Sequence, residues 1–357
     1  MIDSEESRRV AVIGAGSWGT ALAVHCRRRG HETWLWTRTT AHRDAMASDG
    51  YNARYLPVAR PFPDGLGVTH DLAQALVDVD LVIVAVPSHG LRAVMQQVAE
   101  VLAAHPETRP MFLIAAKGVE VDTLKPMAEV LREVLPPVHH EKIAALGGPS
   151  FAAELATGLP TLVVVASRDA VIDATGESGT AVAIQQILSG ANLRVYVSDD
   201  ELGVELGGAF KNVIALAAGV YDGAGLGMNA RAAIITRGLA EITRLSLKLG
   251  AREPTLAGLA GVGDLVLTCT GGLSRNRRVG LALGEGRKLE AILEEMGMVA
   301  EGVKNTQSAR GLARAVGVDM PITEMMYALL YKGVSVGDAV RTLMQRELKP
   351  ERDWASE

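Results

Sequence analysis

The chain of 357 residues is longer than a single hydrophobic core usually grows, so its length predicts two domains. Hydrophobic residues make up 48% and charged residues 22% of the chain, which are the proportions of a globular protein and exclude a disordered one. The formal net charge of −5 argues against a general binding surface for nucleic acid or for anionic membranes.

Cysteine usage and the amino-terminal residues predict a cytoplasmic location. Only Cys26 and Cys269 occur, and neither has the spacing of a metal site, so we expect no disulfide framework and no bound metal. Residues 1–9 are polar and charged, unlike a secretory signal. The longest apolar runs, such as Leu81–Val86, are much shorter than a membrane span, so we do not expect membrane insertion.

The first half of the chain alternates β-branched apolar runs with helical patterns. The predicted strands are Val10–Ile13, Thr33–Trp36, Leu81–Val86, Met111–Ala115, Ile143–Leu146, Thr161–Val165 and Leu193–Val197. Because these runs are apolar at nearly every position, we expect strands buried on both faces, as in a parallel sheet covered by helices. Residues 1–198 are therefore predicted to form a doubly wound, Rossmann-type α/β domain that binds NAD(P).

Beyond residue 198 the strand patterns nearly vanish and apolar residues recur at helical spacing. The predicted helices are Leu202–Val220, Arg231–Leu249, Val279–Leu283, Leu289–Met296, Thr306–Val316 and Thr323–Leu330. Residues 199–357 are therefore predicted to form a mostly α-helical domain, which we expect to serve substrate binding and catalysis.

The first predicted strand runs directly into a glycine-rich turn. Gly14, Gly16 and Gly19 fit the pattern GxGxxG, and the Ala-rich stretch that follows predicts a helix from about Thr20. In this setting the first glycine permits a tight turn, the second lets the backbone approach a pyrophosphate, and the third lets helix and strand pack closely. A flexible turn is the alternative, but the strand-turn-helix context favours a dinucleotide site.

The end of the second strand bears on which dinucleotide binds. NAD-specific sites usually carry an acidic residue about 20 residues after the glycine turn, where it binds the ribose 2′-hydroxyl. This chain has Arg38 between two threonines instead, and a guanidinium can hold a 2′-phosphate. We therefore expect NADPH/NADP, with NADH/NAD as the alternative; a solvated arginine at a strand end is the plainer interpretation.

Candidate anion-binding groups follow two later strands, at the edge of the sheet where ligands sit in α/β proteins. Lys117 comes just after Met111–Ala115, where its side chain can reach an anion; an ordinary loop lysine is the alternative. Gly148 and Ser150 follow Ile143–Leu146. Ser150 is predicted to be the N-cap of the next helix, whose free N–H groups attract phosphates and carboxylates.

Lys211 is the most informative residue, since it lies in an otherwise apolar helix of small side chains, Gly207–Ala215. Desolvation lowers the pKa of an amine, which would let Lys211 exchange a proton with a carbinol or carbonyl oxygen near neutral pH. The alternative is a lysine whose stem covers apolar surface while its amine reaches water. The surrounding glycines and alanines allow a partner to approach closely and favour the catalytic interpretation.

Two further groups of polar residues lie in the helical half. Asp264 sits in a glycine-rich turn, where it can orient Lys211, bind a substrate hydroxyl or simply stabilise the turn. Ser274 is predicted to cap a helix that begins with Arg275 and Asn276, so that N–H groups, a guanidinium and an amide converge on one anion. We interpret this second cluster as a phosphate seat, with an exposed basic helix start as the alternative.

Together these motifs resemble the bacterial-type NAD(P)-dependent glycerol-3-phosphate dehydrogenase family. The matching strings are GAGSWGTAL (14–22), VPSH (86–89), AKG (116–118), GPSFA (148–152), FKNVIA (210–215), GDLVLTCT (263–270), SRNRR (274–278) and EGVKNT (301–306). The resemblance implies a homodimeric oxidoreductase that interconverts dihydroxyacetone phosphate, a small phosphorylated three-carbon substrate, and sn-glycerol 3-phosphate. It also implies a role in supplying glycerol phosphate for phospholipid synthesis.

The resemblance implies roles for individual residues as well. Lys211 would exchange the proton, and Lys117 would contact both substrate and cofactor. The residues implied around glycerol phosphate are Lys117, Gly148, Ser150, Lys211, Asp264, Ser274, Arg275 and Asn276. Those implied around the dinucleotide are Ser17, Trp18, Arg38, Lys117, Ala152, Arg275, Val299 and Glu301.

Two other functions are compatible with parts of the pattern. A two-domain dehydrogenase of the hydroxyacid or 3-hydroxyacyl-CoA type would be expected to use a histidine base, and residues 199–357 contain no histidine. A non-catalytic NADP(H)-sensing protein would need neither an apolar-embedded lysine nor a separate anion seat. Both alternatives therefore account for fewer of these residues.

Overall fold

The computed structural model describes residues 7–169, 179–296, 300–348, 350 and 351, and the chain divides into two compact units. The first unit comprises residues 1–116 and 127–201, and the second comprises residues 117–126 and 202–357. The helical unit thus includes a short segment from the first half of the chain, Lys117–Pro126, which a single division at residue 198 assigns to the other domain.

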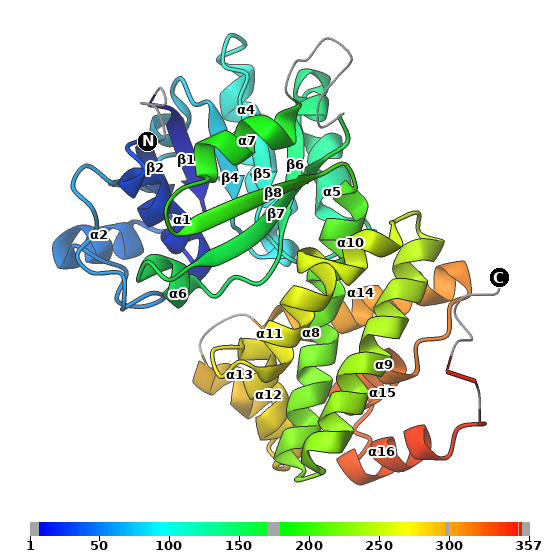
Figure 1. Cartoon of the computed structure of the whole chain (residues 1–357). Helices are drawn as coiled ribbons and strands as arrows, with labels where there is room; N and C mark the ends of the chain where they lie inside the picture. The colour runs from blue at the N-terminus through cyan, green and yellow to red at the C-terminus, as the bar shows by residue number, and fades with distance from the viewer. Residues whose placement is uncertain (1–6, 170–178, 297–299, 349, 352–357) are drawn as a thin grey trace. The chain divides into compact units, whose positions relative to one another are not determined.

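The first unit is built on one eight-stranded sheet (Figure 1). Its strands are β1 (Arg9–Ile13), β2 (Glu32–Trp36), β3 (Gly67–Thr69), β4 (Leu81–Val84), β5 (Met111–Ile114), β6 (Ile143–Gly147), β7 (Thr161–Ser167) and β8 (Leu193–Ser198). They are arranged β3-β2-β1-β4-β5-β6-β7-β8, and the first six have the strand order of dinucleotide-binding folds. The predicted Rossmann-type domain is confirmed, and its strand order reverses at β1, directly before the glycine-rich turn.

Two features of the sheet differ from the sequence prediction. The pattern of the sequence does not reveal β3, because this strand has only three residues and begins with Gly67. β7 pairs with β6 antiparallel, whereas the sequence predicts a parallel sheet throughout. The connection between them holds only the five-residue helix α6 (Ala152–Ala156), and a parallel neighbour usually needs a full crossover helix to return the chain.

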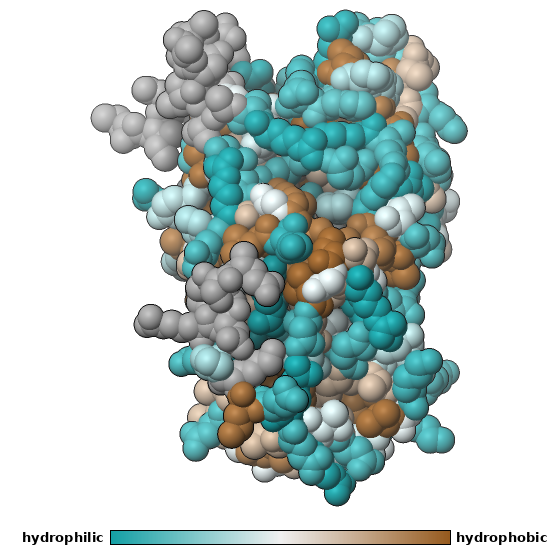
Figure 2. Space-filling view, turned by 90° about the vertical axis from the view of Figure 1, so that its right-hand side faces the viewer, coloured by the Kyte–Doolittle hydropathy of each residue, from teal (hydrophilic) through white to brown (hydrophobic). Residues whose placement is uncertain are grey.

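Helices cover both faces of this sheet. They are α1 (Ser17–Arg28), α2 (Thr40–Asp49), α3 (Leu72–Leu76), α4 (Ser88–Ala103), α5 (Met127–Val134), α6 and α7 (Thr180–Leu188). Val10 and Val12 of β1 enter a core with α1, α6 and α7, whereas Ala11 and Ile13 enter another with α3, α4 and α5. All four side chains are fully buried, as the apolar strands predict. Hydrophilic residues cover most of the face drawn in Figure 2, since the apolar side chains are collected in such cores.

The second unit is mostly helical, as predicted. Its helices are α8 (Glu201–Gly223), α9 (Gly227–Lys248), α10 (Glu253–Ala257), α11 (Asp264–Thr270), α12 (Arg275–Gly284), α13 (Leu289–Met296), α14 (Glu301–Val316), α15 (Pro321–Tyr331) and α16 (Val336–Met344). Among the described helices α8 alone is long and apolar enough to cross a membrane, yet this apolar stretch is entirely buried within the protein. That burial is typical of the central helix of a core.

Glycines on both helices let α8 and α12 approach each other closely. A Cβ at Gly219 or Gly223 of α8 would lie 2.1 or 2.0 Å from a backbone carbonyl oxygen of α12. Conversely, a Cβ at Gly280 or Gly284 of α12 would lie 2.0 or 2.3 Å from a carbonyl oxygen of α8. Only glycine permits backbones this close, so the four glycines determine how near α12 lies to α8.

Gly280→Ala is expected to lower the free energy of unfolding by about 1–3 kcal/mol, because the added methyl group forces two backbones apart. The carbonyl oxygen of Leu216, which it would meet, belongs to a helix and cannot turn aside. Urea unfolding measures the effect. Gly272→Ala is the matched control, since its Cβ would meet no atom within 4 Å and should change stability by less than about 0.5 kcal/mol. Equal stability of the two variants would contradict the close helix packing.

Candidate active site

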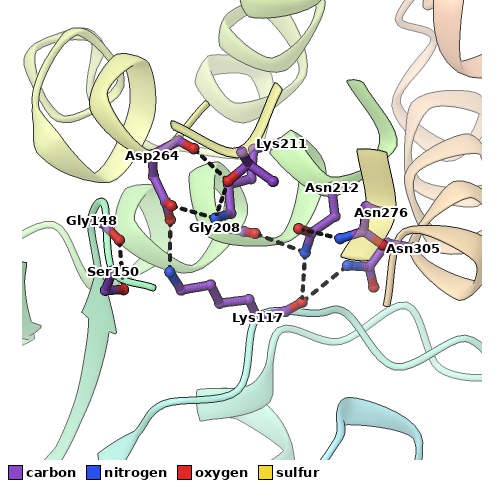
Figure 3. Close-up of polar contacts among 10 residues, drawn as sticks. Lys117, Gly148, Ser150, Gly208, Lys211, Asn212, Asp264, Asn276 and Asn305 are labelled. Atoms are coloured by element: carbon purple, nitrogen blue, oxygen red, sulfur yellow. Dashed lines mark hydrogen bonds and ion pairs between the residues drawn. The ribbon is translucent and has the colours of Figure 1, made fainter. Parts of the chain in front are cut away.

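Asp264 bridges two lysine side chains in the second unit (Figure 3). The Nζ of Lys211 donates to Oδ1 of Asp264 and, over 2.8 Å, to Oγ1 of Thr268. The Nζ of Lys117 donates to Oδ2 of the same carboxylate over 2.8 Å. The side chain of Asp264 is only 1% exposed, and that of Lys211 is 7% exposed. One buried carboxylate therefore serves as counterion to two ammonium groups.

Close backbone packing around α8 places these groups. A Cβ at Gly207 would lie 2.8 Å from the carbonyl oxygen of Ala260, and one at Gly208 would lie 3.4 Å from a side-chain carbon of Lys117. Asp264 follows a single π-helical turn, Leu259–Gly263, which leads directly into α11. Such turns often mark functional sites. The small residues around Lys211 thus admit partners to close range, as the sequence predicts.

The surroundings of Lys211 suit proton exchange. Burial is the largest influence and lowers the pKa of Lys211 to about 8, while Asp264 opposes this shift and Lys117 adds to it. An amine with this pKa is protonated at neutral pH and can still release its proton. Asp264 and Thr268 account for two of its three N–H groups among the described residues, so the third is available to a ligand oxygen.

Three buried asparagines extend the polar site (Figure 3). Asn276 donates from Nδ2 to Oδ1 of Asn212 over 2.8 Å, and its Oδ1 accepts from the N–H of Gly302 over 3.0 Å. Asn212 and Asn305 each donate from Nδ2 to the carbonyl oxygen of Lys117, over 3.4 and 3.0 Å. These amides attach the main chain at Lys117 to α8 and α14.

The start of α12 is the segment that the sequence predicts to bind an anion. Ser274 is the N-cap, and its Oγ accepts from the N–H of Arg277 over 3.2 Å. Arg275, the first residue of the helix, is half-buried; burial lowers the pKa of its guanidinium and Glu301 raises it. Asn276 uses one amide hydrogen on Asn212, and the other has no acceptor among the described residues, so that it can serve an anion. The predicted capping by Ser274 is confirmed.

The glycine-rich turn of the first unit fits the phosphates of a dinucleotide. Gly14 has φ +119°, and a Cβ there would lie 2.8 Å from the carbonyl group of Ala85. A Cβ at Gly19 would lie 2.0 Å from the carbonyl oxygen of Gly14, whereas one at Gly16 would meet nothing within 4 Å. α1 begins at Ser17 rather than near Thr20, and no side chain of the residues that the structure describes caps its N-terminus by a hydrogen bond. Open backbone and uncapped N–H groups are what a pyrophosphate needs.

The other residues implied around the dinucleotide lie on several elements. They are Ser17 and Trp18 at the start of α1, Arg38 in the exposed segment after β2, Ala152 at the start of α6 and Glu301 at the start of α14. Ser17 donates from Oγ to the carbonyl oxygen of Tyr55 over 2.6 Å. Val299 lies outside the described residues.

Ser150 does not cap the next helix, and that prediction is wrong. Its Oγ donates to the carbonyl oxygen of Gly148 over 3.0 Å, and α6 begins only after Phe151, with no side-chain cap. Phe151 is extended and separates Ser150 from the helix. Gly148 has φ +108°, a conformation that favours glycine, so the turn after β6 depends on it.

Sequence reasoning missed three polar residues that the structure brings to the lysines. They are Thr268, Asn212 and Asn305. Thr268 follows Asp264 by four residues on one helix, a spacing that places two side chains on the same face. Asn212 adjoins Lys211 in an apolar helix, which is the same pattern that singled out the lysine. Among the described residues no cluster of three or more His, Cys, Asp or Glu side chains is arranged to hold a metal ion.

Comparison with known proteins finds the same family along nearly the whole chain. Residues 9–173 match the family model described as NAD-dependent glycerol-3-phosphate dehydrogenase N-terminus, and residues 200–341 match that of the C-terminus. The chain is 51% identical over 344 residues to a glycerol-3-phosphate dehydrogenase [NAD(P)+] of Syntrophotalea carbinolica, covering 96% of this chain and 99% of that protein. It is 48% identical over 348 residues to the protein of that name from Geobacter sulfurreducens, covering 97% and 99%.

Solved structures agree with the sequence matches. The crystal structure of glycerol-3-phosphate dehydrogenase from Coxiella burnetii is 38% identical, with a TM-score of 0.87 and coverage of 95% of this chain and 99% of that one. D-Mandelate dehydrogenase, at 12% identity and a TM-score of 0.59, shares the fold alone.

Proposed function

Since the chain belongs to the NAD-dependent glycerol-3-phosphate dehydrogenase family, we propose that it interconverts dihydroxyacetone phosphate and sn-glycerol 3-phosphate. NADPH is the expected reductant, with NADH as the alternative. The observation that carries the proposal is the buried amine of Lys211, whose pKa of about 8 suits proton exchange with the oxygen at C2 of the substrate. The bound cofactor supplies or accepts the hydride.

The residues of the second unit transfer the proton, stabilise charge and bind the phosphate. Lys211 donates a proton to the C2 oxygen during reduction and takes it back during oxidation. Asp264 favours the charged form of Lys211, against burial. Lys117, the second ammonium on that carboxylate, assists by its charge, which stabilises negative charge developing on the oxygen. The N–H groups of the first turn of α12, which Ser274 caps, bind the phosphate together with the Arg275 guanidinium and the Asn276 amide. The family resemblance adds Gly148 and Ser150 to the substrate contacts.

The cofactor is assigned to the glycine-rich turn. The backbone from Gly14 to Gly19 and the N-terminus of α1 hold the pyrophosphate, and Arg38 binds the 2′-phosphate of NADP(H). The family resemblance assigns further cofactor contacts, to Ser17, Trp18, Lys117, Ala152, Arg275, Val299 and Glu301.

Oxidation of NADPH by dihydroxyacetone phosphate, followed by absorbance, tests the proposed reaction. Dihydroxyacetone, which lacks the phosphate, is the control substrate. Its kcat/KM should be lower by at least about 100-fold because the phosphate seat stays empty. If the protein binds NADPH but none of the phosphorylated ketones tested causes its oxidation, the assignment is contradicted and a sensing role is favoured.

Arg38→Ala is expected to raise the KM for NADPH by about tenfold and to leave the KM for NADH unchanged, because only NADPH carries the 2′-phosphate. Arg38 is exposed, so stability should not change. Arg194→Ala is the control, since Arg194 is an exposed arginine of the same unit that lies over the ring of Tyr196. Equal effects on both cofactors would remove Arg38 from cofactor discrimination.

We also propose a cytoplasmic homodimer that supplies glycerol phosphate for phospholipid synthesis. The family resemblance supports the dimer and the metabolic role, and the two free, buried cysteines, Cys26 and Cys269, agree with a reducing compartment. Light scattering of the purified protein measures the mass in solution. A monomer at the concentrations of the activity assay would contradict the dimer without affecting the proposed reaction.

A further inference from the structure

Asn52 is fully buried next to the glycine-rich turn and has no part in the function described above. Its Nδ2 donates to the carbonyl oxygen of Ala15 over 3.0 Å and to Oγ1 of Thr20 over 2.8 Å. Ala15 stands between Gly14 and Gly16, so Asn52 holds the turn by its central carbonyl group.

This carbonyl determines where the turn directs its N–H groups. In a trans peptide the C=O of Ala15 and the N–H of Gly16 point in opposite directions. When Asn52 binds the oxygen, the N–H of Gly16 must point away from Asn52. This peptide unit turns about ψ of Ala15 and φ of Gly16, and glycine rotates about φ more freely than other residues, so the hydrogen bond from Asn52 favours one orientation.

Hydrogen-bond directions determine which nitrogen of the neighbouring His42 ring carries a hydrogen. A carbonyl oxygen only accepts, so Nδ2 of Asn52 faces Ala15 and its Oδ1 faces the opposite way. There Oδ1 accepts from the N–H of Tyr55 over 3.2 Å and lies 3.2 Å from Nε2 of His42. Nε2 of His42 therefore carries a hydrogen. In the neutral ring Nδ1 then accepts from the Thr37 hydroxyl, 2.9 Å away.

We propose that Asn52 and His42 are positioning residues for the dinucleotide, which they serve by keeping the N–H of Gly16 directed at its phosphates. The hydrogen bonds run from Thr37 through His42 and Asn52 to Ala15, in that order. Thr37 adjoins Arg38, so one network connects the segment assigned to the 2′-phosphate with the turn assigned to the pyrophosphate. This inference rests on the proposed function, because it concerns how that cofactor is held.

Binding of NADPH alone, measured by calorimetry without substrate, tests the inference. Asn52→Ala and His42→Ala should each weaken NADPH binding by about tenfold or more, because the peptide after Ala15 loses its constraint. At saturating NADPH, kcat and the KM for dihydroxyacetone phosphate should stay within about twofold of wild type, since neither residue is assigned a contact with the reacting atoms. His42→Gln, which keeps a donor near the position of Nε2, should recover part of the affinity.

His140→Ala is the matched control. His140 is half-buried in the same unit, and its Nε2 lies 3.0 Å from the carbonyl oxygen of Leu135, but it is not part of this network. If the His42 and His140 variants lower the melting temperature alike and bind NADPH like wild type, the network is merely structural and the inference fails.

A second variant covers the case in which Asn52→Ala does not fold. Thr37→Val keeps the shape of the side chain and removes only the hydroxyl that donates to His42. Wild-type affinity in both Thr37→Val and His42→Ala would overturn the inference. Wild-type protein that binds neither NADPH nor NADH would instead refute the proposed function, so the two failures are distinguishable.

Discussion

Lys211→Ala is expected to lower kcat for dihydroxyacetone phosphate reduction by about 100- to 10,000-fold, the usual contribution of a positioned acid or base. Binding of NADPH should survive, because the cofactor is assigned to the glycine-rich turn of the other unit. Steady-state kinetics and calorimetry on the same preparation separate these two effects.

Two further variants make the Lys211 result specific. Lys211→Arg keeps a positive charge but cannot readily release a proton, so its activity should stay low. Lys248→Ala removes an exposed lysine from the end of α9 and should leave turnover unchanged. Near-normal turnover in a folded Lys211→Ala protein would eliminate the amine as the proton carrier.

Asp264→Asn is expected to have the second largest effect, because it removes the counterion of two lysines at once. Asp264 favours the charged form of Lys211, so the pKa of Lys211 should fall below about 8 in this variant. Reduction needs the protonated amine, and kcat/KM should therefore decline with rising pH above about pH 8 in wild type and from a lower pH in Asp264→Asn. In the oxidation direction, which needs the neutral amine, the rising limb should move to lower pH in the same way.

The same substitution should also lower the free energy of unfolding, by about 3–5 kcal/mol, because it leaves cations in a buried site without a counterion. Asp222→Asn is a matched control. Asp222 also bridges two cations of the second unit, Arg231 and Arg277, and 14% of its side chain is exposed. The Asp222→Asn substitution should lower stability without changing the pH at which kcat/KM declines. A shift of the limb in Asp222→Asn but not in Asp264→Asn would contradict the assigned pairing.

The sequence by itself determined most of the strands, the helical character of the second half and the chemistry available to both. Apolar runs predicted strands buried on both faces, and every residue from 10 to 13 in β1 is buried in this way. The prediction is wrong for β8, where buried residues alternate with exposed Arg194 and Tyr196. The roles of the three glycines in the turn could be predicted, because each role depends on local backbone geometry. Lys211 was recognisable because a cation in an apolar helix is costly wherever the helix packs.

Only the tertiary structure decided which groups meet. The sequence left Asp264 with several roles, and folding paired it with Lys211 and with Lys117, which is 147 residues away in the chain. The sequence also did not show that β7 runs antiparallel to β6 or that glycines bring α8 and α12 together. Nor did it show that Asn52 donates a hydrogen bond to Ala15. The physical reason is that periodicity and propensity describe one element at a time, whereas these contacts depend on how distant segments pack against each other.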